Sequence, residues 1–330
     1  MVCDKLINYR CDTGVRYYRC ISMAGKKPQA GKVWLDGKIV DYEKAKVPIL
    51  THSMQYGSGI FEGMRAYQTA EGTAIFRLSD HMKRFMDTAK IYSMNLGYTA
   101  QELELASMAT VKANGLKECY IRPFAFYNDD RIGLNPKDKL ISVFIAAVPF
   151  GAYYGTAKQK GLRCKVSSWR RINSDILPVE AKASGNYVNS IISSNEAHAS
   201  GFDESIMLSR QGYVAEGPAE NIFIVERGRL ITPGHDADIL LGITRDSIAK
   251  MAESMGIEVE KRNMHVEELY TAEEVFFTGT AAEVTPIINI DGMRIGKGRP
   301  GPITTTLSKK YDDAVHGRDR EFGHWLTYVK

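Results

Sequence analysis

The chain has 330 residues, of which 44% are hydrophobic and 25% charged, a composition typical of a globular protein long enough for two domains. Its net charge of +4 is small for this length and gives little support for nucleic acid as a partner. No apolar run approaches the ~18 residues that cross a membrane, and residues 1–10 lack the pattern of a secretory signal. We therefore expect a cytoplasmic protein that binds neither membranes nor nucleic acid.

Residues 1–31 are polar and basic without clear periodicity, and we interpret them as an N-terminal extension. Within it, Val15–Met23 is either part of a surface segment or an extra strand. The chain has five cysteines and no C-x-x-C pair, so we expect neither a zinc site nor a dithiol redox site, and no metal. A disulfide among the N-terminal cysteines has no support in the spacing; the cysteines are Cys3, Cys11, Cys20, Cys119 and Cys164.

The next 120 or so residues predict strands and two helices. V-W-L-D-G-K-I-V from Val33 indicates a hairpin with Asp36-Gly37 as its turn. Ser79 is a plausible N-cap for a helix that runs to about Tyr92. A capping box at Thr99-x-x-Glu102 begins a second helix, which should end near Gly115. Two apolar strands and the polar turn between them follow, at Cys119–Phe126, Leu140–Val148 and Asn128–Lys139 respectively.

Two glycine-rich stretches do not fit nucleotide-binding loops. His52–Tyr67 has the spacing G-x-G-x-x-x-G and no helical pattern directly after it, so it is not a dinucleotide fingerprint. Gly292–Lys297 is one residue short of a phosphate loop. Both nucleotide interpretations are therefore rejected.

Two glycines and a proline in residues 149–160 break both periodicities and indicate a linker between domains 32–148 and 161–330. In the second domain strands alternate with helical stretches, and the clearest helix runs from Thr244, as its cap, to Met255, where Gly256 ends it. This pattern predicts an α+β fold of two domains. The expected strands are Leu162–Ser167, Glu204–Leu208, Asn221–Glu226, Glu274–Thr278 and Ile287–Ile290.

Lys182 lies in L-P-V-E-A-K-A-S-G-N-Y, residues 177–187, among small residues that leave room around its amine. Burial would disfavour the charged ammonium, and the neutral amine can form a Schiff base with an aldehyde. Taken alone, however, these eleven residues fit an ordinary surface lysine better. A second motif, Y-V-A-E-G-P-A-E-N-I-F from Tyr213, decides between the two interpretations.

Together these motifs resemble the class IV pyridoxal-phosphate aminotransferases, and most closely the branched-chain amino-acid aminotransferases. The resemblance extends from about Val33 to Leu307. It implies a fold type IV enzyme, in which a small α/β domain lies beside a larger pseudo-barrel α/β domain with the cofactor between them. It further implies a homodimer or higher homo-oligomer that acts on small amino acids and 2-oxo acids.

By this resemblance Lys182 is the catalytic residue, carrying the cofactor and then the proton. Glu216 faces the ring nitrogen of pyridoxal 5′-phosphate, and Tyr187 faces its phenolic oxygen. Arg84 offers a bidentate cation to the phosphate. The helix start at Ile243 and Thr244, in L-G-I-T-R-D, adds an anion site, and Thr280, in F-T-G-T-A-A-E, adds a hydroxyl.

The substrate pocket implied by the resemblance includes the strand motif Tyr120-Ile121-Arg122, whose alternation points Tyr120 and Arg122 to one face. That pocket must accept an apolar side chain or the distal carboxylate of glutamate. The turn at Thr280-Ala281 would hold the α-carboxylate. The other matching positions are Phe61, Arg65 and Tyr153, with Tyr56 and the Leu134 loop reaching in from the partner subunit.

Two departures concern the size of the pocket: Phe150 replaces a tryptophan common in relatives, and Arg131 lies in a loop that is usually glycine-rich. The expected activity is transamination between leucine, isoleucine or valine and 2-oxoglutarate. Three alternatives stay open: a D-amino-acid or (R)-amine transaminase, an aminodeoxychorismate lyase of the same fold, and a non-catalytic pyridoxal-phosphate carrier. The intact Y-I-R argues against the first.

Overall fold

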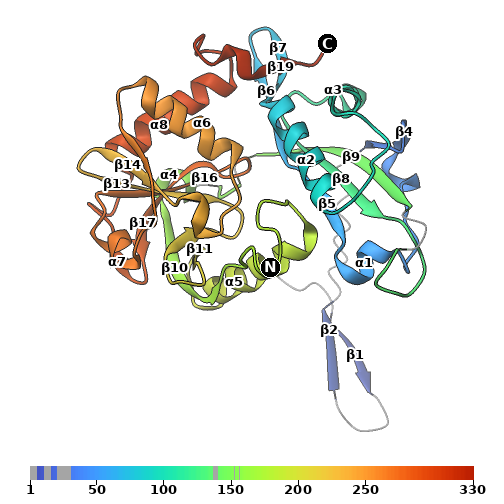
Figure 1. Cartoon of the computed structure of the whole chain (residues 1–330), viewed down its shortest axis with the longest axis horizontal. Coiled ribbons are helices and arrows are strands. Elements are labelled where there is room, and N and C mark those ends of the chain that lie inside the picture. The colour runs from blue at the N-terminus through green and yellow to red at the C-terminus, as the bar shows by residue number, and fades with distance from the viewer. Residues whose placement is uncertain (1–5, 11–15, 21–30, 137–139, 152, 156) are drawn as a thin grey trace.

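A computed structural model describes residues 6–10, 16–20, 31–136, 140–151, 153–155 and 157–330. Figure 1 shows two bodies side by side, each built around its own sheet. Strands β1 (Leu6–Arg10) and β2 (Arg16–Cys20) form a separate hairpin that projects from them, and β2 falls within the stretch considered as an extra strand. The predicted absence of a disulfide concerns side chains outside the described part of the extension.

The first body contains an antiparallel sheet in the order β19-β7-β6-β8-β9-β3-β4, with β5 paired to β8. The predicted hairpin is confirmed, and Asp36 and Gly37 both have positive φ, at 44° and 89°, as a two-residue turn of this kind requires. The strands are β3 (Lys32–Leu35), β4 (Lys38–Asp41), β5 (Gly59–Phe61), β6 (Met64–Thr69), β7 (Gly72–Phe76), β8 (Cys119–Tyr127), β9 (Ile141–Pro149) and β19 (Leu326–Tyr328).

Helices α2 (Leu78–Ile91) and α3 (Ala100–Asn114) cover one face of this sheet and bury a core with it. The Thr99 capping box is confirmed, and α3 ends at Gly115 in a left-handed conformation. Ser79 as the cap of α2 was wrong. The cap is Arg77, which has φ 54° and donates its N–H to the carbonyl of Trp325, so a long-range contact sets where this helix begins.

The second body is a closed barrel of six strands in the order β12-β11-β10-β17-β16-β13, and the pairing of Glu216 with Asn221 joins β12 back to β13. Strands β14 and β15 extend the sheet beyond β13, and β18 pairs with β17. The five predicted strands are all present. The bounds are β10 (Leu162–Arg170), β11 (Glu204–Leu208), β12 (Val214–Glu216), β13 (Asn221–Glu226), β14 (Arg229–Thr232), β15 (Val259–Lys261), β16 (Glu274–Gly279), β17 (Glu283–Ile290) and β18 (Met293–Arg294).

Alternate residues of β13 enter two different cores because its two faces are both covered. Ile222 and Ile224 join apolar side chains from every barrel strand, so that core fills the barrel. Phe223 and Val225 pack outward against α6 (Ile243–Ser254) and α8 (Pro302–Val315). The remaining helices are α1 (His52–Tyr56), α4 (Ala157–Lys160), α5 (Tyr187–Ala199) and α7 (Val266–Thr271).

Helix α6 begins one residue before the predicted cap, since its N-cap is Gly242 and not Thr244. A Cβ at Gly242 would lie 1.9 Å from Oδ1 of Asn221, so only glycine fits where this helix meets β13. The predicted end is confirmed, because Gly256 has φ 76° just beyond the helix.

The chain's last strand belongs to the first body although the preceding elements belong to the second. Strand β19 pairs with β7, and Trp325, just before it, packs against Phe76. The same core contains Tyr67 from β6 and Phe223 and Phe276 from the barrel, and it joins the two bodies. No helix in the described segments has the length and apolarity needed to cross a membrane.

Candidate active site

The site lies where the loop before α5 meets β5 of the first body, and its centre is Lys182. The backbone of Lys182 is fixed from both sides: its N–H donates to Thr88 of α2, and its carbonyl accepts from Phe61 of β5. Its Nζ lies 2.5 Å from the hydroxyl of Tyr187, the first residue of α5. Burial, with the nearby Arg84 cation, lowers the pKa of Lys182 to about 8. The surface-lysine interpretation is therefore wrong.

Glu216 ends β12 on the opposite side of the same cavity and accepts hydrogen bonds from three groups. Nε of Arg171 lies 2.7 Å from one carboxylate oxygen, Nδ2 of Asn221 lies 3.0 Å from the other, and the Leu240 N–H completes the set at 3.2 Å. Burial raises the pKa of Glu216, while Arg171 and the Leu240 N–H oppose that rise. These donors hold a carboxylate in place without a solvent shell.

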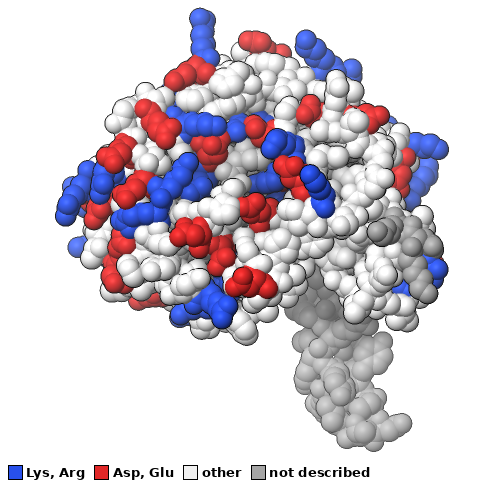
Figure 2. Space-filling model, in the orientation of Figure 1, with Lys and Arg blue, Asp and Glu red and all other residues white. Residues whose placement is uncertain are grey.

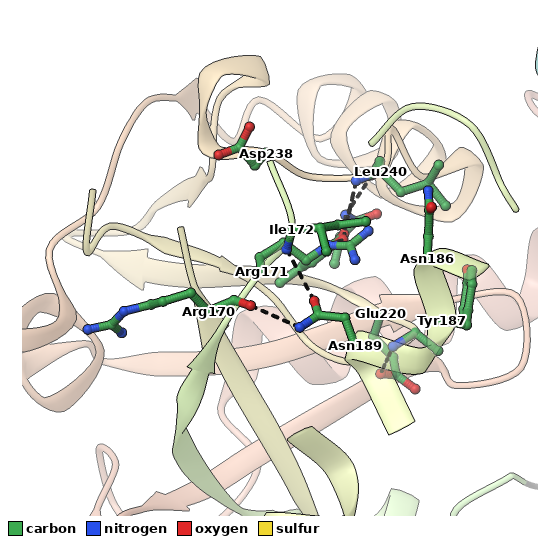
Figure 3. A network of polar contacts seen from close by, with 12 residues as sticks. Arg170, Arg171, Ile172, Asn186, Tyr187, Asn189, Glu220, Asp238 and Leu240 are labelled. Carbon is green, nitrogen blue, oxygen red and sulfur yellow. Dashed lines mark hydrogen bonds and ion pairs between the residues drawn. The ribbon is translucent and has the colours of Figure 1, made fainter. Parts of the chain in front are cut away.

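Arg171 is a site residue that the sequence did not reveal. Asn189 of α5 accepts from the Ile172 N–H and donates to the Arg170 carbonyl, which aligns the backbone on both sides of Arg171 (Figure 3). Nε of Arg171 holds Glu216, but its buried Nη1 has no hydrogen-bond partner within the described chain. A buried donor without a partner is costly, so the cavity offers a position for an acceptor.

Arg84 on α2 points toward the cavity, but its two-pronged contact is made within the chain. Its Nε and Nη2 bind the two carboxylate oxygens of Glu62 at 2.6 and 3.0 Å, and its Nη1 donates to the Leu241 carbonyl. Glu62 is fully buried and also accepts from His81, which keeps its pKa well below the usual range despite burial. The prediction of a bidentate contact from Arg84 to phosphate was therefore wrong, because Glu62 occupies that edge of the guanidinium.

The N-terminus of α6 and the β16–β17 turn form the wall next to Arg84. Ile243 and Thr244 are the first two residues of α6, whose N–H groups have no acceptor within the helix. Thr280 lies in the turn that follows β16, and the buried hydroxyl of Thr278 has no partner among the described residues. Helix dipole, free N–H groups and hydroxyls together make a site for an anion.

The cavity between these walls has an empty volume of about 450 Å³, which includes space open to solvent. That lies within the roughly 300–1,000 Å³ of small-molecule pockets. Its lining brings together all of the predicted cofactor residues: Arg84, Lys182, Tyr187, Glu216, Ile243, Thr244 and Thr280. An amine, a carboxylate opposite it, partnerless buried donors and a helix N-terminus fit an aldehyde-bearing aromatic phosphate. No cluster of three potential metal ligands occurs among the described residues.

An aromatic and cationic wall adjoins Lys182 on the side of the first sheet. Tyr120 and Arg122 project to the same side of β8, as predicted, and Nη2 of Arg122 donates to the Tyr120 hydroxyl at 3.0 Å. The Arg122 guanidinium lies 4.5 Å from the ring centre of Phe61. Phe150 packs against Tyr120 at 5.1 Å and against Tyr153 at 6.4 Å, so the departure at Phe150 lies within this wall.

Tyr56 and Leu134 are not brought to this cavity within one chain. They lie beside one another: the Tyr56 hydroxyl accepts from the Gly133 N–H, and the Leu134 carbonyl contacts the His52 ring. Leu134 is 82% exposed. Arg131, in the same loop, pairs with Asp129 and is half-exposed. The placement of these residues in a partner's site stays a prediction.

Comparison with known proteins identifies the class. Residues 59–290, more than half of the chain, match the family model for amino-transferase class IV. The chain thus belongs to the class IV aminotransferases, and the resemblance inferred from its motifs is confirmed.

The relatives narrow this assignment. A branched-chain-amino-acid aminotransferase of Pseudomonas aeruginosa is 44% identical over 301 residues, 91% of this chain and 98% of that protein. The chain is a member of the branched-chain-amino-acid aminotransferases. Solved structures agree: the enzyme of Thermoproteus uzoniensis with norvaline has a TM-score of 0.87 and 48% identity, covering 91% of this chain and 100% of that one. The T.th. enzyme complexed with N-(5′-phosphopyridoxyl)-L-glutamate has a TM-score of 0.88 and 44% identity over 92% and 100%. The predicted fold class is confirmed.

Proposed function

We propose that the protein transfers the amino group between leucine, isoleucine or valine and 2-oxoglutarate, with pyridoxal 5′-phosphate as its cofactor. The observation that carries this proposal is the buried Lys182 amine in one cavity with Glu216 and the α6 N-terminus, beside the Tyr120–Arg122 wall. Relatives solved with a phosphopyridoxyl-glutamate adduct and with norvaline support both kinds of substrate.

The cofactor's groups match the two ends of the cavity. Glu216 would hold the ring nitrogen, and Tyr187 the phenolic oxygen. The Ile243 and Thr244 N–H groups, with the Thr280 hydroxyl, would hold the phosphate. Arg84 would contribute its positive charge and its Nη1 edge, since its other edge binds Glu62. Arg171 Nη1 and the Thr278 hydroxyl lie close enough to line the same cavity.

When bound, pyridoxal phosphate accepts the amino group and delocalises the electron pair left when the substrate Cα loses its proton. Lys182 Nζ takes that proton and returns it to the adjacent carbon, which its lowered pKa allows near neutral pH. Glu216 stays anionic through its three donors and keeps the ring nitrogen protonated. Tyr187 donates or accepts at the position that Nζ occupies before substrate arrives.

The substrate side chain would lie against Phe61, Tyr120 and Phe150, which offer apolar contact to leucine. Arg122 would pair with the distal carboxylate of 2-oxoglutarate, because a second carboxylate leaves water only if it is paired. The N–H groups of the Thr280-Ala281 turn would hold the α-carboxylate common to both substrates. Arg65 and Tyr153 would complete the pocket.

We further propose that the active form is a homodimer or larger homo-oligomer. Large apolar side chains are exposed in α1, the segment before it and the loop carrying Leu134, and Figure 2 shows few charged groups around α1. Elsewhere on that face positive and negative side chains are interspersed. Pairing across this surface would bring Tyr56 and Leu134 toward a neighbour's site; its exposed members are Val47, Ile49, Leu50, Met54, Ile132 and Leu134. The domain division at residues 149–160 and the cytoplasmic location are proposed on the same sequence grounds as before.

The test is to mix the purified protein with L-leucine and 2-oxoglutarate and to measure 4-methyl-2-oxopentanoate and L-glutamate. We expect both products with L-leucine and none with D-leucine or an (R)-amine. Pyruvate released from aminodeoxychorismate without any acceptor would indicate a lyase, and a chromophore unchanged by amino acids would indicate a carrier. Borohydride reduction should place the pyridoxyl label on Lys182, and a label on another lysine would refute the site.

A further inference from the structure

Arg65 and Glu283 form a buried ion pair that joins the two bodies next to the substrate wall. Arg65, on β6, is 7% exposed and lies opposite Tyr120 of β8. Its Nη1 donates to Oε1 of Glu283 at 2.8 Å, and the Tyr67 hydroxyl donates to the same oxygen at 2.9 Å. The Arg65 guanidinium also lies 5.4 Å from the Phe150 ring centre, directly behind the wall.

The backbone of Glu283 shows that its side chain is needed there. Gly279 pairs with Glu283 across a loop of three residues, and Glu283 has φ 56°. Loops of this length normally place glycine at the left-handed position, because a Cβ is unfavourable there. A glutamate at this position incurs that conformational cost, and in return its carboxylate reaches Arg65.

The pair determines how much charge the substrate wall carries. Two arginines, Arg65 and Arg122, lie on the strands that form it. The charge of Arg65 is matched by Glu283, and the Tyr67 and Glu283 groups hold the pKa of Arg65 above its ordinary value although burial lowers it. Arg122 donates to the neutral Tyr120 hydroxyl and has no ion pair within the described chain. One cation, rather than two, is therefore left for the substrate.

We infer that Glu283 is a specificity-determining residue: by cancelling the charge of Arg65 it leaves the pocket a single net cation. One cation pairs the distal carboxylate of a dicarboxylic substrate, whereas a second would attract dicarboxylates strongly and make the wall unfavourable for an apolar side chain. Glu283 thus keeps the pocket open to both substrate classes. This inference rests on the proposed function.

The experiment compares kcat/KM for 2-oxoglutarate with kcat/KM for 4-methyl-2-oxopentanoate in cofactor-loaded variants. Glu283→Gln keeps an oxygen that accepts from Arg65 and Tyr67 but removes the negative charge. We expect the ratio to rise by about tenfold or more in favour of 2-oxoglutarate, equivalent to about 1.4 kcal/mol. Glu118→Gln is the matched control, because Glu118 acts on Arg65 only at a distance and is exposed, and it should leave the ratio unchanged.

Arg65→Gln gives a second test with the opposite sign. It leaves the Glu283 carboxylate unmatched, so the ratio should fall below the wild-type value, and the double variant should return toward it. Loss of structure alone would not shift the ratio in opposite directions in the two single variants. Circular dichroism and thermal unfolding identify which variants fold, and any one that folds tests the inference.

An unchanged ratio in a folded Glu283→Gln or Arg65→Gln protein would overturn the role of Glu283. That result leaves the proposed function intact as long as the wild type transaminates leucine. Failure of the wild type with leucine would instead refute the proposed function itself.

Discussion

The reactivity of Lys182 is the property of the site that can be tested without substrate. Its amine is buried beside the Arg84 guanidinium, and its pKa falls from the ordinary value of 10.5 to about 8. That difference corresponds to roughly 3.4 kcal/mol against the charged form. At pH 7 about 9% of such amines are neutral, compared with about 0.03% at the ordinary value, so we expect roughly 300-fold more neutral amine.

Competitive labelling of the apoprotein with acetic anhydride measures this directly. The reagent acts only on neutral amines, so the pH dependence of labelling gives the pKa, while accessibility changes only the absolute rate. Peptide mapping by mass spectrometry isolates Lys182, and its labelling should reach half-maximum near pH 8. A midpoint near pH 10.5 would refute the argument that burial and Arg84 set the pKa.

Arg84→Gln separates the two causes. Without that cation, and with Glu62 left as an unmatched anion nearby, the labelling midpoint of Lys182 should move upward. The matched control is Lys83→Gln, one residue away on α2, where the ammonium is 80% exposed and pairs with Asp87. The control should leave the midpoint unchanged, and an unchanged midpoint in Arg84→Gln would show that Arg84 does not act on Lys182.

Three further outcomes follow from the same contacts. Glu216→Gln should still bind cofactor but slow the single-turnover reaction with leucine by about 10²–10³, as loss of one well-placed electrostatic partner typically does; equal rates would exclude its role at the ring nitrogen. Arg122→Leu should lower kcat/KM for glutamate and 2-oxoglutarate by at least about a hundredfold and for leucine by less than about tenfold, since stranding one buried charge costs roughly 2–5 kcal/mol; equal losses would place Arg122 at the α-carboxylate or in folding. Burial and Glu204 raise the pKa of Glu220 to about 7, so the folded state retains a proton that the unfolded chain releases near pH 4.5, and stability falls as pH rises between those values. Glu220→Gln, which keeps an acceptor for Tyr154, should remove up to about 3 kcal/mol of that decline in urea unfolding across this range, whereas a profile parallel to the wild type would contradict it.

Local chemistry accounts for the parts of the fold that the sequence predicted well. The Asp36-Gly37 turn and the Thr99 capping box involve residues within four positions of one another, so their geometry follows from neighbouring residue types. Periodicity also located the barrel strands. The two helix caps that were wrong, Ser79 and Thr244, lie where a distant segment sets the helix start.

The candidate site divides in the same way. Lys182 and Glu216 could be found because each lies in a short motif. Glu62 and Arg171 could not, because their roles depend on Arg84 and Glu216, which are 22 and 45 positions away and meet them only in the folded chain. A buried acid such as Glu62, in F-E-G-M-R, gave one usable signal: a charged residue inside an otherwise apolar strand pattern requires a partner.

Strand β19 makes assembly of the first body depend on the end of the message. During synthesis β7 leaves the ribosome about 250 residues before its partner, and until then it is an open sheet edge that can pair with other chains. The start of α2 waits as well, because the Arg77 N–H finds its acceptor only at Trp325. A ribosome that stalls within the last few codons, or a nuclease that shortens the message there, would therefore release a chain with an unfinished N-terminal half. C-terminal fusions should be designed to leave residues 325–328 free to pair with that edge.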